Sequence, residues 1–401
     1  MKFAIATLGC KVNQYESQLI REALLSGGFS EQDFSLPGAD LYIVNTCTVT
    51  HRSDAEDRRL VRRAEGFGAR TIVTGCRVKV SPGSDGISTG SAEMVPFEGL
   101  AAALGVHMPE GITGFSGHAR AFVNIQQGCS NCCAFCIVPL ARGKPRSRPV
   151  NEIVNEVVTL YSKGFREIIL TGINIGLYEG GLVHLIQRLL DESPMPRLRI
   201  SSLEPWTLTD ELMDMILSEK RICRHLHLPL QSGSDRILSL MGRPYDAPHY
   251  RRIVSALKET DPGMAIGADV MVGFPGETEE DFLQTLSLVQ GIDITYLHVF
   301  PFSRRKGTRA YAMPGQVDPR IMKQRAAELR DLSREKRKAF IASQVGKNLE
   351  VLVTTEEEIS FSGITSNYIK VEAQGKASVN DLVMVGIEEA HDAYASGRPR
   401  G

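Results

Sequence analysis

Short apolar runs alternate with longer amphipathic stretches along the first quarter of this chain. Apolar runs occupy residues 2–7, 40–45 and 70–74, and stretches with apolar residues at helical spacing occupy 13–25 and 53–64. Ser53 and Glu56 have the spacing of a capping box, which predicts the start of the second helix. Strands that alternate with helices predict an open α/β domain over residues 1–110.

The middle of the chain repeats the order of strand and helix. The predicted strands are 121–126, 167–171, 198–203, 225–230, 266–272 and 295–301, and the predicted helices include 151–162, 182–190, 210–218, 250–259 and 279–290. Repeated βα units predict a parallel sheet curled into a partial (β/α)6 barrel. Together with a long basic helix at 320–343, this second domain covers residues 120–340.

The last part of the chain changes to short apolar runs without helical stretches between them. These runs lie at 349–354, 359–365, 369–373 and 382–387. They predict a small all-β barrel over residues 345–390, followed by about ten residues of loose tail. The barrel is acidic overall, so any contact with RNA must use a local face, for which Tyr368 and Lys370 are the candidates.

A cysteine loop follows the first strand of the predicted barrel. Cys129, Cys133 and Cys136 have the spacing C-x3-C-x2-C, with an additional Cys132 between them. Three thiolates on one loop can hold three corners of a cubane iron–sulfur cluster and leave one iron open to a substrate. The alternatives are zinc, whose paired C-x2-C halves are usually further apart, and a disulfide, which is rare without a secretory signal.

Three further cysteines each follow a predicted strand of the first domain. Cys10, Cys47 and Cys76 lie at the carboxyl ends of the three apolar runs, beside small residues. Carboxyl ends of strands line the ligand crevice of an open α/β sheet, so these cysteines should converge. They are either a second site for an iron–sulfur cluster or three buried cysteines that act as small hydrophobic residues.

Polar residues follow the other predicted barrel strands, at the same face as the cysteine loop. They include Thr171 and Gly172, then Ser202 and Glu204, then Gln231, and finally the loop 273–278. Ligands bind at the carboxyl ends of barrel strands, so these loops predict a cofactor pocket. The alternative is that they are ordinary helix-entry loops, with Glu277 or Thr278 as a helix cap.

Local charge indicates a possible partner, whereas the formal net charge of −1 does not. Residues 304–340 are strongly basic, and we expect either a solvated face or a surface for phosphate. The candidates for RNA contact near the barrel are Arg243, Arg304, Arg305 and Arg309. No apolar run is long enough to cross a membrane and the N-terminus does not resemble a signal peptide, so a cytoplasmic location without membrane contact is expected.

The cysteine loop, with aromatic Phe135 before its last cysteine, resembles that of the radical S-adenosylmethionine superfamily. The segments Thr7–Ser17, Val44–Thr50 and Val73–Cys76 are similar to the three cysteine motifs of its methylthiotransferase family, and His227–Gly233 and Asp269–Thr278 are similar to its barrel motifs. The C-terminal barrel resembles the family's TRAM domain. Lys11-Val12-Asn13-Gln14-Tyr15 most resembles the branch that acts on N6-threonylcarbamoyladenosine at tRNA position 37. Two differences are Cys132 and Arg77-Val78-Lys79 after Cys76.

The resemblance implies two 4Fe-4S clusters, a radical cluster on Cys129, Cys133 and Cys136 and an auxiliary cluster on Cys10, Cys47 and Cys76. It implies two S-adenosylmethionine molecules per turnover, bound near Phe135, Thr171, Gly172, Ser202, Glu204 and Gln231. The partners would be tRNA, a reductant such as flavodoxin or ferredoxin, and a sulfur donor. The product would be a methylthio group on carbon 2 of the adenine.

Other functions remain open at this point. The substrate would alternatively be isopentenyl-adenosine in tRNA or an aspartate of a ribosomal protein. A function of another class would be that of a non-catalytic iron–sulfur protein that binds RNA or transfers electrons. We expect Cys132 to have no ligand role, because adjacent cysteines are awkward ligands of the same cluster.

Overall fold

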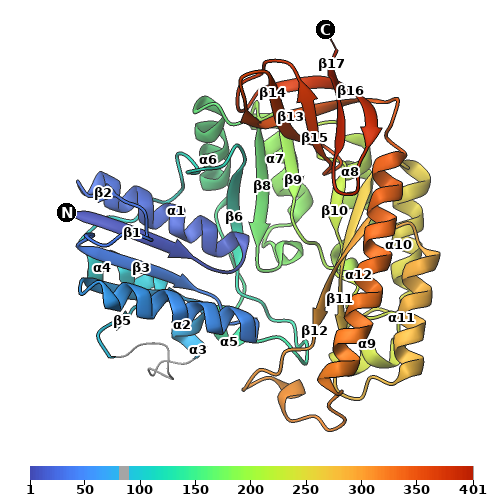
Figure 1. Ribbon diagram of the computed structural model, residues 1–401, viewed down its shortest axis with the longest axis horizontal. Helices are drawn as coiled ribbons and strands as arrows, with labels where there is room; N and C mark the ends of the chain where they lie inside the picture. The colour runs from blue at the N-terminus through green and yellow to red at the C-terminus, as the bar shows by residue number, and fades with distance from the viewer. Residues whose placement is uncertain (81–89, 401) are drawn as a thin grey trace.

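The computed structural model describes residues 1–80 and 90–400, and it has three parts (Figure 1). The N-terminal part is a parallel sheet in the order β2-β1-β3-β4-β5. Its strands are β1 Lys2–Thr7, β2 Ser30–Glu31, β3 Leu41–Thr46, β4 Arg70–Gly75 and β5 Glu93–Met94, and its helices are α1 Lys11–Ser26, α2 His51–Gly66, α3 Cys76–Val80 and α4 Leu100–Leu104. The predicted strand and helix order is confirmed here.

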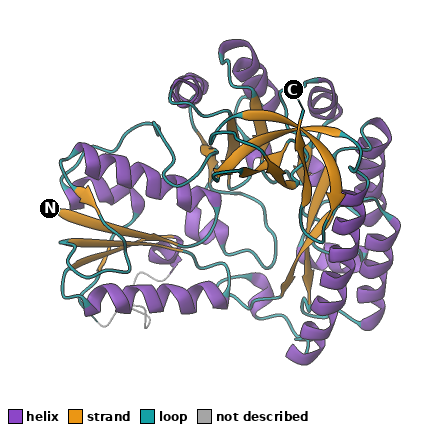
Figure 2. Ribbon diagram, turned by 45° about the horizontal axis from the view of Figure 1, so that its top comes forward, coloured by secondary structure: helices purple, strands orange, loops and turns teal. Residues whose placement is uncertain are grey.

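Helices cover both faces of this sheet, as Figure 2 shows. Strand β3 is buried along its whole length, which explains its continuous apolar run. The predicted cap of α2 was wrong by three residues. The N-cap is Thr50, whose side chain accepts from the Ser53 backbone N–H, while the Ser53 side chain accepts from the Thr50 N–H. Ser53 therefore stands at the third helical position of the capping box and not at its first.

The central part is the predicted partial barrel of six parallel strands. They are β6 Ala121–Gln127, β8 Glu167–Gly172, β9 Arg197–Ile200, β10 His225–His227, β11 Ala265–Val272 and β12 Tyr296–Pro301, with β7 Arg146–Ser147 antiparallel to β6. Isolated bridges from Ser202 to His227 and from Leu198 to Ile222 join β9 to β10. The helices are α5 Val138–Arg142, α6 Val150–Ser162, α7 Leu182–Glu192, α8 Asp210–Ser218, α9 Asp235–Met241, α10 Ala247–Thr260 and α11 Glu279–Gly291.

The C-terminal part is a closed barrel in the order β13-β14-β15-β17-β16. Its strands are β13 Asn348–Glu356, β14 Ser360–Thr365, β15 Lys370–Gln374, β16 Leu382–Ala390 and β17 Ala395–Pro399. The predicted loose tail was wrong, because β17 pairs with both β15 and β16 and closes the barrel. Sequence patterning missed β17 because it is built from small residues. A Cβ at Gly397 would lie 2.1 Å from the carbonyl oxygen of Gly386, so this closure requires glycine.

The C-terminal barrel seals the amino end of the central strands. Helix α12 Pro319–Ala342 leads into it, and Phe340 and Ile341 join its core. Arg199 on β9 donates to the carbonyl oxygens of Thr365 (3.1 Å) and Ser366 (3.0 Å) in the β14–β15 turn. The opposite, carboxyl end of the central strands carries the cysteine loop. Among the residues that the structure describes, no helix is long and apolar enough to span a bilayer.

Candidate active site

The first candidate centre lies where β1, β3 and β4 end. Cys10 follows β1, Cys47 follows β3, and Cys76 begins α3 directly after β4. A Cβ at Gly9 would lie 3.1 Å from Cys47 Sγ, and one at Gly75, where φ is +91°, would lie 2.5 Å from the Thr46 carbonyl oxygen. Only glycine allows these close approaches. The three strand ends are therefore gathered at one edge of the sheet, as predicted.

Asn13 ties the first two cysteine loops together. It has no exposed surface, and its Nδ2 donates to the carbonyl oxygens of Leu8 (2.9 Å) and Thr46 (2.8 Å). Its Oδ1 accepts from Cys10 Sγ at 3.4 Å. One turn into α1, a single amide thus fixes the segments before Cys10 and Cys47, which explains why an asparagine stands three residues after the cysteine.

The thiols of this centre are electrostatically coupled. Burial raises the pKa of Cys76 to about 12, Arg142 opposes this, and the other two thiols raise it further. Burial also raises the pKa of Cys47, and Cys10 adds to the effect. Three thiols that repel one another as thiolates need a shared cation to ionise together, which iron supplies. The donor set therefore fits an iron–sulfur cluster.

Arg142 of the central barrel completes this centre. Its Nε donates to Cys76 Sγ at 3.1 Å and one terminal nitrogen donates to Asn13 Oδ1 at 2.6 Å. The guanidinium forms a two-point ion pair with Glu16, in which one hydrogen bond is 3.0 Å long. Arg142 and Glu16 are both buried. Since Arg142 ends α5, the helix that follows the cysteine loop, one side chain connects the two groups of cysteines.

The second candidate centre is the loop after β6. The Cys129 backbone N–H donates to the Gly143 carbonyl at 3.0 Å, and the Cys136 N–H donates to the Cys133 carbonyl at 3.1 Å. Ala134 N–H donates to the Met241 carbonyl at the end of α9, also at hydrogen-bond distance (2.8 Å). Phe135 packs against the apolar cluster around Phe274 and Phe302. The loop is held on both sides, so its thiols have a fixed arrangement.

The thiols of this loop are electrostatically coupled, like those of the first centre. Burial raises the pKa of Cys136 to about 12, with contributions from Cys133 and Cys129. Burial also raises the pKa of Cys133, and Arg243 opposes this. In contrast, Cys132 is exposed and its Sγ lies 3.8 Å from the Ser130 carbonyl oxygen. The three spaced cysteines thus form one coupled group that fits a cluster, and Cys132 points elsewhere.

No group of three or more His, Cys, Asp or Glu side chains in residues 1–80 and 90–400 is arranged to hold a single metal ion. A mononuclear site requires all of its ligands to reach one atom, whereas the cysteines of a cubane each bind a different iron.

Arg243 lies at the cluster loop and not on the surface, where an RNA contact had been expected. It is 7% exposed, and its NH1 donates to Cys133 Sγ at 3.3 Å. It also forms a two-point ion pair with Glu204, and its guanidinium lies 4.6 Å from the centre of the Trp206 ring. The two cysteine groups are thus built alike, each with one arginine on a sulfur and one glutamate behind the arginine.

The residues predicted for S-adenosylmethionine lie at the carboxyl ends of barrel strands or in the loops that follow them. Thr171 is buried in β8, and Gly172 ends that strand beside Gln126. Ser202 is exposed and bridges to His227, while Gln231 has a φ of +66° and its N–H donates to the Asp269 carbonyl at 2.7 Å. Glu204 connects this group to the cluster loop through Arg243. The binding role of these residues stays a prediction.

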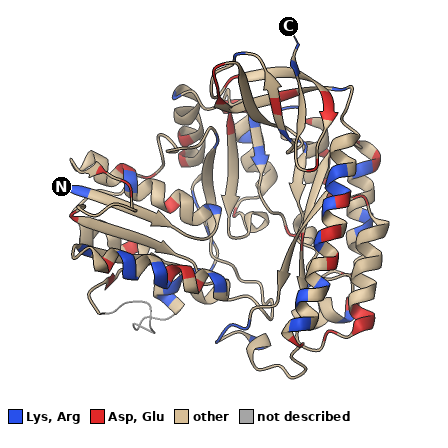
Figure 3. Cartoon of the chain, viewed as in Figure 1, with Lys and Arg blue, Asp and Glu red and all other residues tan. Residues whose placement is uncertain are grey.

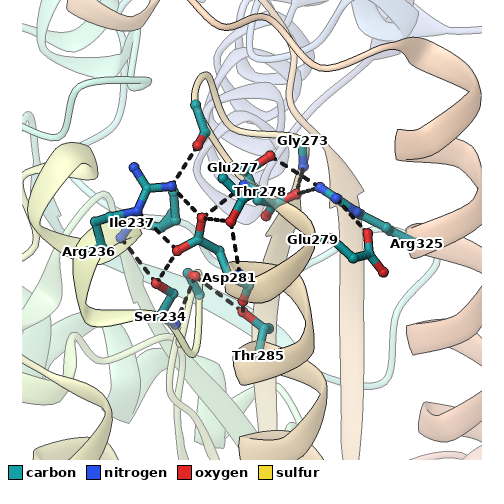
Figure 4. A network of polar contacts seen from close by, with 12 residues as sticks. Ser234, Arg236, Ile237, Gly273, Glu277, Thr278, Glu279, Asp281, Thr285 and Arg325 are labelled. Atoms are coloured by element: carbon teal, nitrogen blue, oxygen red, sulfur yellow. Dashed lines mark hydrogen bonds and ion pairs between the residues drawn. The ribbon is translucent and has the colours of Figure 1, made fainter.

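The loop after β11 has a structural role (Figure 4). Thr278 is the N-cap of α11 in a capping box with Asp281, as the alternative reading had expected. Glu277 accepts from the Gly273 N–H at 2.7 Å and pairs with Arg325 of α12 at 2.7 Å. Arg325 also pairs with Glu279 at 2.8 Å. The network therefore fixes the turn from β11 to α11 and joins it to α12.

The other RNA candidates differ in accessibility. Arg304 and Arg309 are exposed, and Arg309 NH2 donates to the Cys132 carbonyl at 2.8 Å. Arg305 is buried in an ion pair with Asp54, contrary to the expectation of an RNA contact. The Tyr368 ring stacks on His225 with centroids 4.3 Å apart, and Lys370 is exposed beside Glu372. Tyr368 thus packs at the amino end of the barrel.

Helix α12 is less free to bind phosphate than its composition suggests. Figure 3 shows basic and acidic residues interspersed along it. Several of its basic residues are engaged within the protein. Arg325 pairs with glutamates, Arg330 donates to the Val299 carbonyl, and Lys336 donates to the Ile292 carbonyl at 2.8 Å. Some of the basic residues of α12 therefore hold the helix against the barrel and are not free to bind phosphate.

Sequence reasoning missed Arg142, Glu16 and the pair His227–Asp269, whose atoms Nε2 and Oδ1 are 3.0 Å apart. In the sequence, Arg142 stands with Lys144, Arg146 and Arg148 in a basic group after the cysteine loop, which does not distinguish its role. Glu16 is the one acidic residue among the buried residues of α1. An unpaired carboxylate on a buried face requires a basic partner elsewhere.

Comparison with known proteins agrees with this geometry. Residues 123–289 match the family model described as "Radical SAM superfamily", and residues 2–90 match "Uncharacterized protein family UPF0004". The chain is 36% identical to "Threonylcarbamoyladenosine tRNA methylthiotransferase MtaB" of Bacillus subtilis, over 98% of this chain and 95% of that protein. This chain belongs to the radical S-adenosylmethionine methylthiotransferase family. Membership in the radical SAM superfamily brings a 4Fe-4S cluster and S-adenosylmethionine as cofactors.

Two further relatives show the breadth of the methylthiotransferase family. The Aquifex aeolicus protein of the same name is 35% identical, over 96% of this chain and 100% of its own. A Treponema denticola "tRNA-2-methylthio-N(6)-dimethylallyladenosine synthase" is 32% identical over 88% of each chain. Among solved structures, the radical S-adenosylmethionine methyltransferase TsrM of Kitasatospora setae has a TM-score of 0.55 at 14% identity, covering 77% of each chain. That likeness concerns the fold alone.

Proposed function

We propose that this protein adds a methylthio group to carbon 2 of N6-threonylcarbamoyladenosine at position 37 of tRNA. The single observation that supports this most is the link through Arg142, which bonds Cys76 of one cysteine group and lies six positions after Cys136 of the other. Two groups of three cysteines that are linked in this way suit a reaction that needs a radical generator and a sulfur carrier. Full-length similarity to proteins named for this substrate supports its identity.

Cys129, Cys133 and Cys136 would hold the radical cluster, and Cys10, Cys47 and Cys76 a second, auxiliary cluster. When bound, the reduced radical cluster and S-adenosylmethionine supply a hydrogen-abstracting radical, and the auxiliary cluster supplies the sulfur. Arg243 and Arg142 each hold a sulfur ligand by a hydrogen bond and so fix its orientation. Cys47, Cys76 and Asn13 are buried, whereas Cys10 is exposed, so one side of this group of cysteines is open to a substrate.

A reductant such as flavodoxin or ferredoxin and a sulfur donor complete the proposed reaction, which uses two S-adenosylmethionine molecules per turnover. Arg304 and Arg309 are exposed near the cysteine loop and are suited to contact tRNA phosphates. A tRNA substrate also favours the cytoplasm as the location. The alternative substrate is dimethylallyl-adenosine, which the more distant relatives are named for.

Turnover with defined RNA hairpins distinguishes these substrates. The reconstituted, reduced protein is given S-adenosylmethionine and an anticodon stem-loop that carries either threonylcarbamoyl- or dimethylallyl-adenosine. We expect the methylthio product from the first hairpin at a rate at least tenfold above that from the second, measured by mass spectrometry of the digested RNA. A preference for the dimethylallyl hairpin would reject the substrate, and the absence of 5′-deoxyadenosine with either would reject the enzyme class.

A further inference from the structure

Lys11 lies on the side of α1 that faces the central barrel. It is the first residue of the helix and follows Cys10 directly. Tyr15, one helical turn later on the same face, is buried in the core of the central barrel together with Leu19. The Tyr15 hydroxyl reaches Glu156 of α6 at 3.3 Å. Because Lys11 lies on the same face of α1 as Tyr15, its side chain is directed toward the barrel, beside the strand ends that carry the cysteines.

The ammonium of Lys11 lies among charges of its own sign. Burial lowers the pKa of Lys11, and Arg120 and Arg199 lower it further, whereas Asp269 has the opposite effect. Asp269 is already bonded to His227 at 3.0 Å. Within the part of the chain that the structure describes, the Lys11 side chain has no hydrogen bond or ion pair of its own. Lys11 is half-buried, and an ammonium that is partly removed from water without a partner is costly unless a ligand supplies one.

The barrel interior has more positive than negative charge around this ammonium. Glu167 is the acidic partner of Arg120 (3.5 Å), Arg197 (2.8 Å) and Arg199 (2.7 Å) at once. One carboxylate thus faces three guanidinium groups. His225 lies buried beside them with an Nδ1 that has no hydrogen-bond partner, but burial holds its pKa well below the usual range, so the ring adds no charge. This excess predicts that an anion enters the barrel during function.

We propose that Lys11 binds the carboxylate of the threonylcarbamoyl group, and so selects the modified adenosine. The proposal rests on the proposed function. Carbon 2 of the adenine must lie near the sulfur held by Cys10, Cys47 and Cys76. The N6 substituent leaves the same edge of the adenine ring as carbon 2, so its carboxylate extends past Cys10 along the path of the Lys11 side chain. A dimethylallyl group carries no charge and would leave the ammonium without a partner.

The test compares three anticodon stem-loops at one salt concentration, since phosphate contacts depend on salt. They carry N6-threonylcarbamoyladenosine, its carboxamide analogue, or unmodified adenosine at position 37. The cluster-loaded wild-type protein should bind the carboxylate hairpin about 10- to 100-fold tighter than the carboxamide, because a hydrogen bond to a charged group has that effect. Lys11→Met should abolish the preference and Lys11→Arg should retain most of it. The matched control, Lys163→Met, replaces an exposed lysine outside this region and should retain all of it.

Each other outcome overturns the proposal. Equal binding of carboxylate and carboxamide by the wild-type protein excludes recognition of the carboxylate, whatever the variants do. If Lys11→Met weakens all three hairpins equally, the ammonium binds a backbone phosphate instead. Turnover of the carboxylate hairpin is measured in the same preparation. Product without preference rejects only the role of Lys11, whereas no product rejects the proposed function itself.

Discussion

Cys133→Ala should abolish formation of 5′-deoxyadenosine, whereas Cys76→Ala should retain it and abolish the methylthio product. The two cysteines belong to separate coupled groups on separate elements, so each variant should empty one centre. Iron and sulfide should fall from about eight each per chain to about four in either variant, as expected for the loss of one cubane. Both products and the metal content can be measured on the same reconstituted samples.

Cys132→Ala is the matched control for this pair, because Cys132 lies in the same loop as Cys133 but is exposed. It should retain both products and the full iron content. Loss of the cluster's absorbance or EPR signal in Cys132→Ala would overturn the assignment of three ligands. Loss of 5′-deoxyadenosine in Cys76→Ala would contradict the proposal that the two centres function separately.

Arg142→Met should destabilise the protein by about 3–5 kcal/mol, because it leaves the buried Glu16 carboxylate without its partner. It also removes the N–H on Cys76 Sγ, which should lower the reduction potential of the auxiliary cluster. Denaturant titration followed by a potentiometric EPR titration measures the two effects. The double variant Arg142→Met/Glu16→Gln should recover part of the lost stability, since it no longer buries an unpaired charge.

The exposed pair Arg59–Glu56 provides the control, because it has the same ionic chemistry with solvent around it. Arg59→Met should change stability little. If Arg142→Met has no greater effect than Arg59→Met, the ion pair does not connect the two cysteine groups as described. An unchanged potential of the auxiliary cluster in Arg142→Met would show that the bond to Cys76 Sγ has no electronic role.

Features with a local pattern could be predicted from the sequence. The apolar runs before Cys10, Cys47 and Cys76 predicted β1, β3 and β4. Because parallel strands end at the same edge of a sheet, the sequence also predicted that the three cysteines lie together. Thr278 was anticipated as a helix cap. The strand β17 was not predicted, because Ala395, Ser396 and Gly397 are too small to give an apolar alternation and are held by pairing on both sides.

Features that depend on contacts between distant segments could not be predicted from the sequence. Arg243 and Arg305 had been assigned to an RNA surface because they are charged. Their partners, Glu204 and Asp54, lie 39 and 251 positions away. The contact between Arg142 and Cys76 joins residues 66 positions apart. No periodicity in a single chain reports such pairs, which is why the contacts of Arg142 and Arg243 with the two cysteine groups emerged only from the structure.

Nucleoside analysis of tRNA from a strain that lacks this protein tests the central claim most directly. Total tRNA is digested and the modified nucleosides are quantified by mass spectrometry, with and without a plasmid that encodes the intact chain. The methylthio form of threonylcarbamoyladenosine should disappear, its precursor should accumulate, and the plasmid should restore the methylthio form. An unchanged level of that nucleoside, or loss of the methylthio form of dimethylallyl-adenosine instead, would contradict the proposed function.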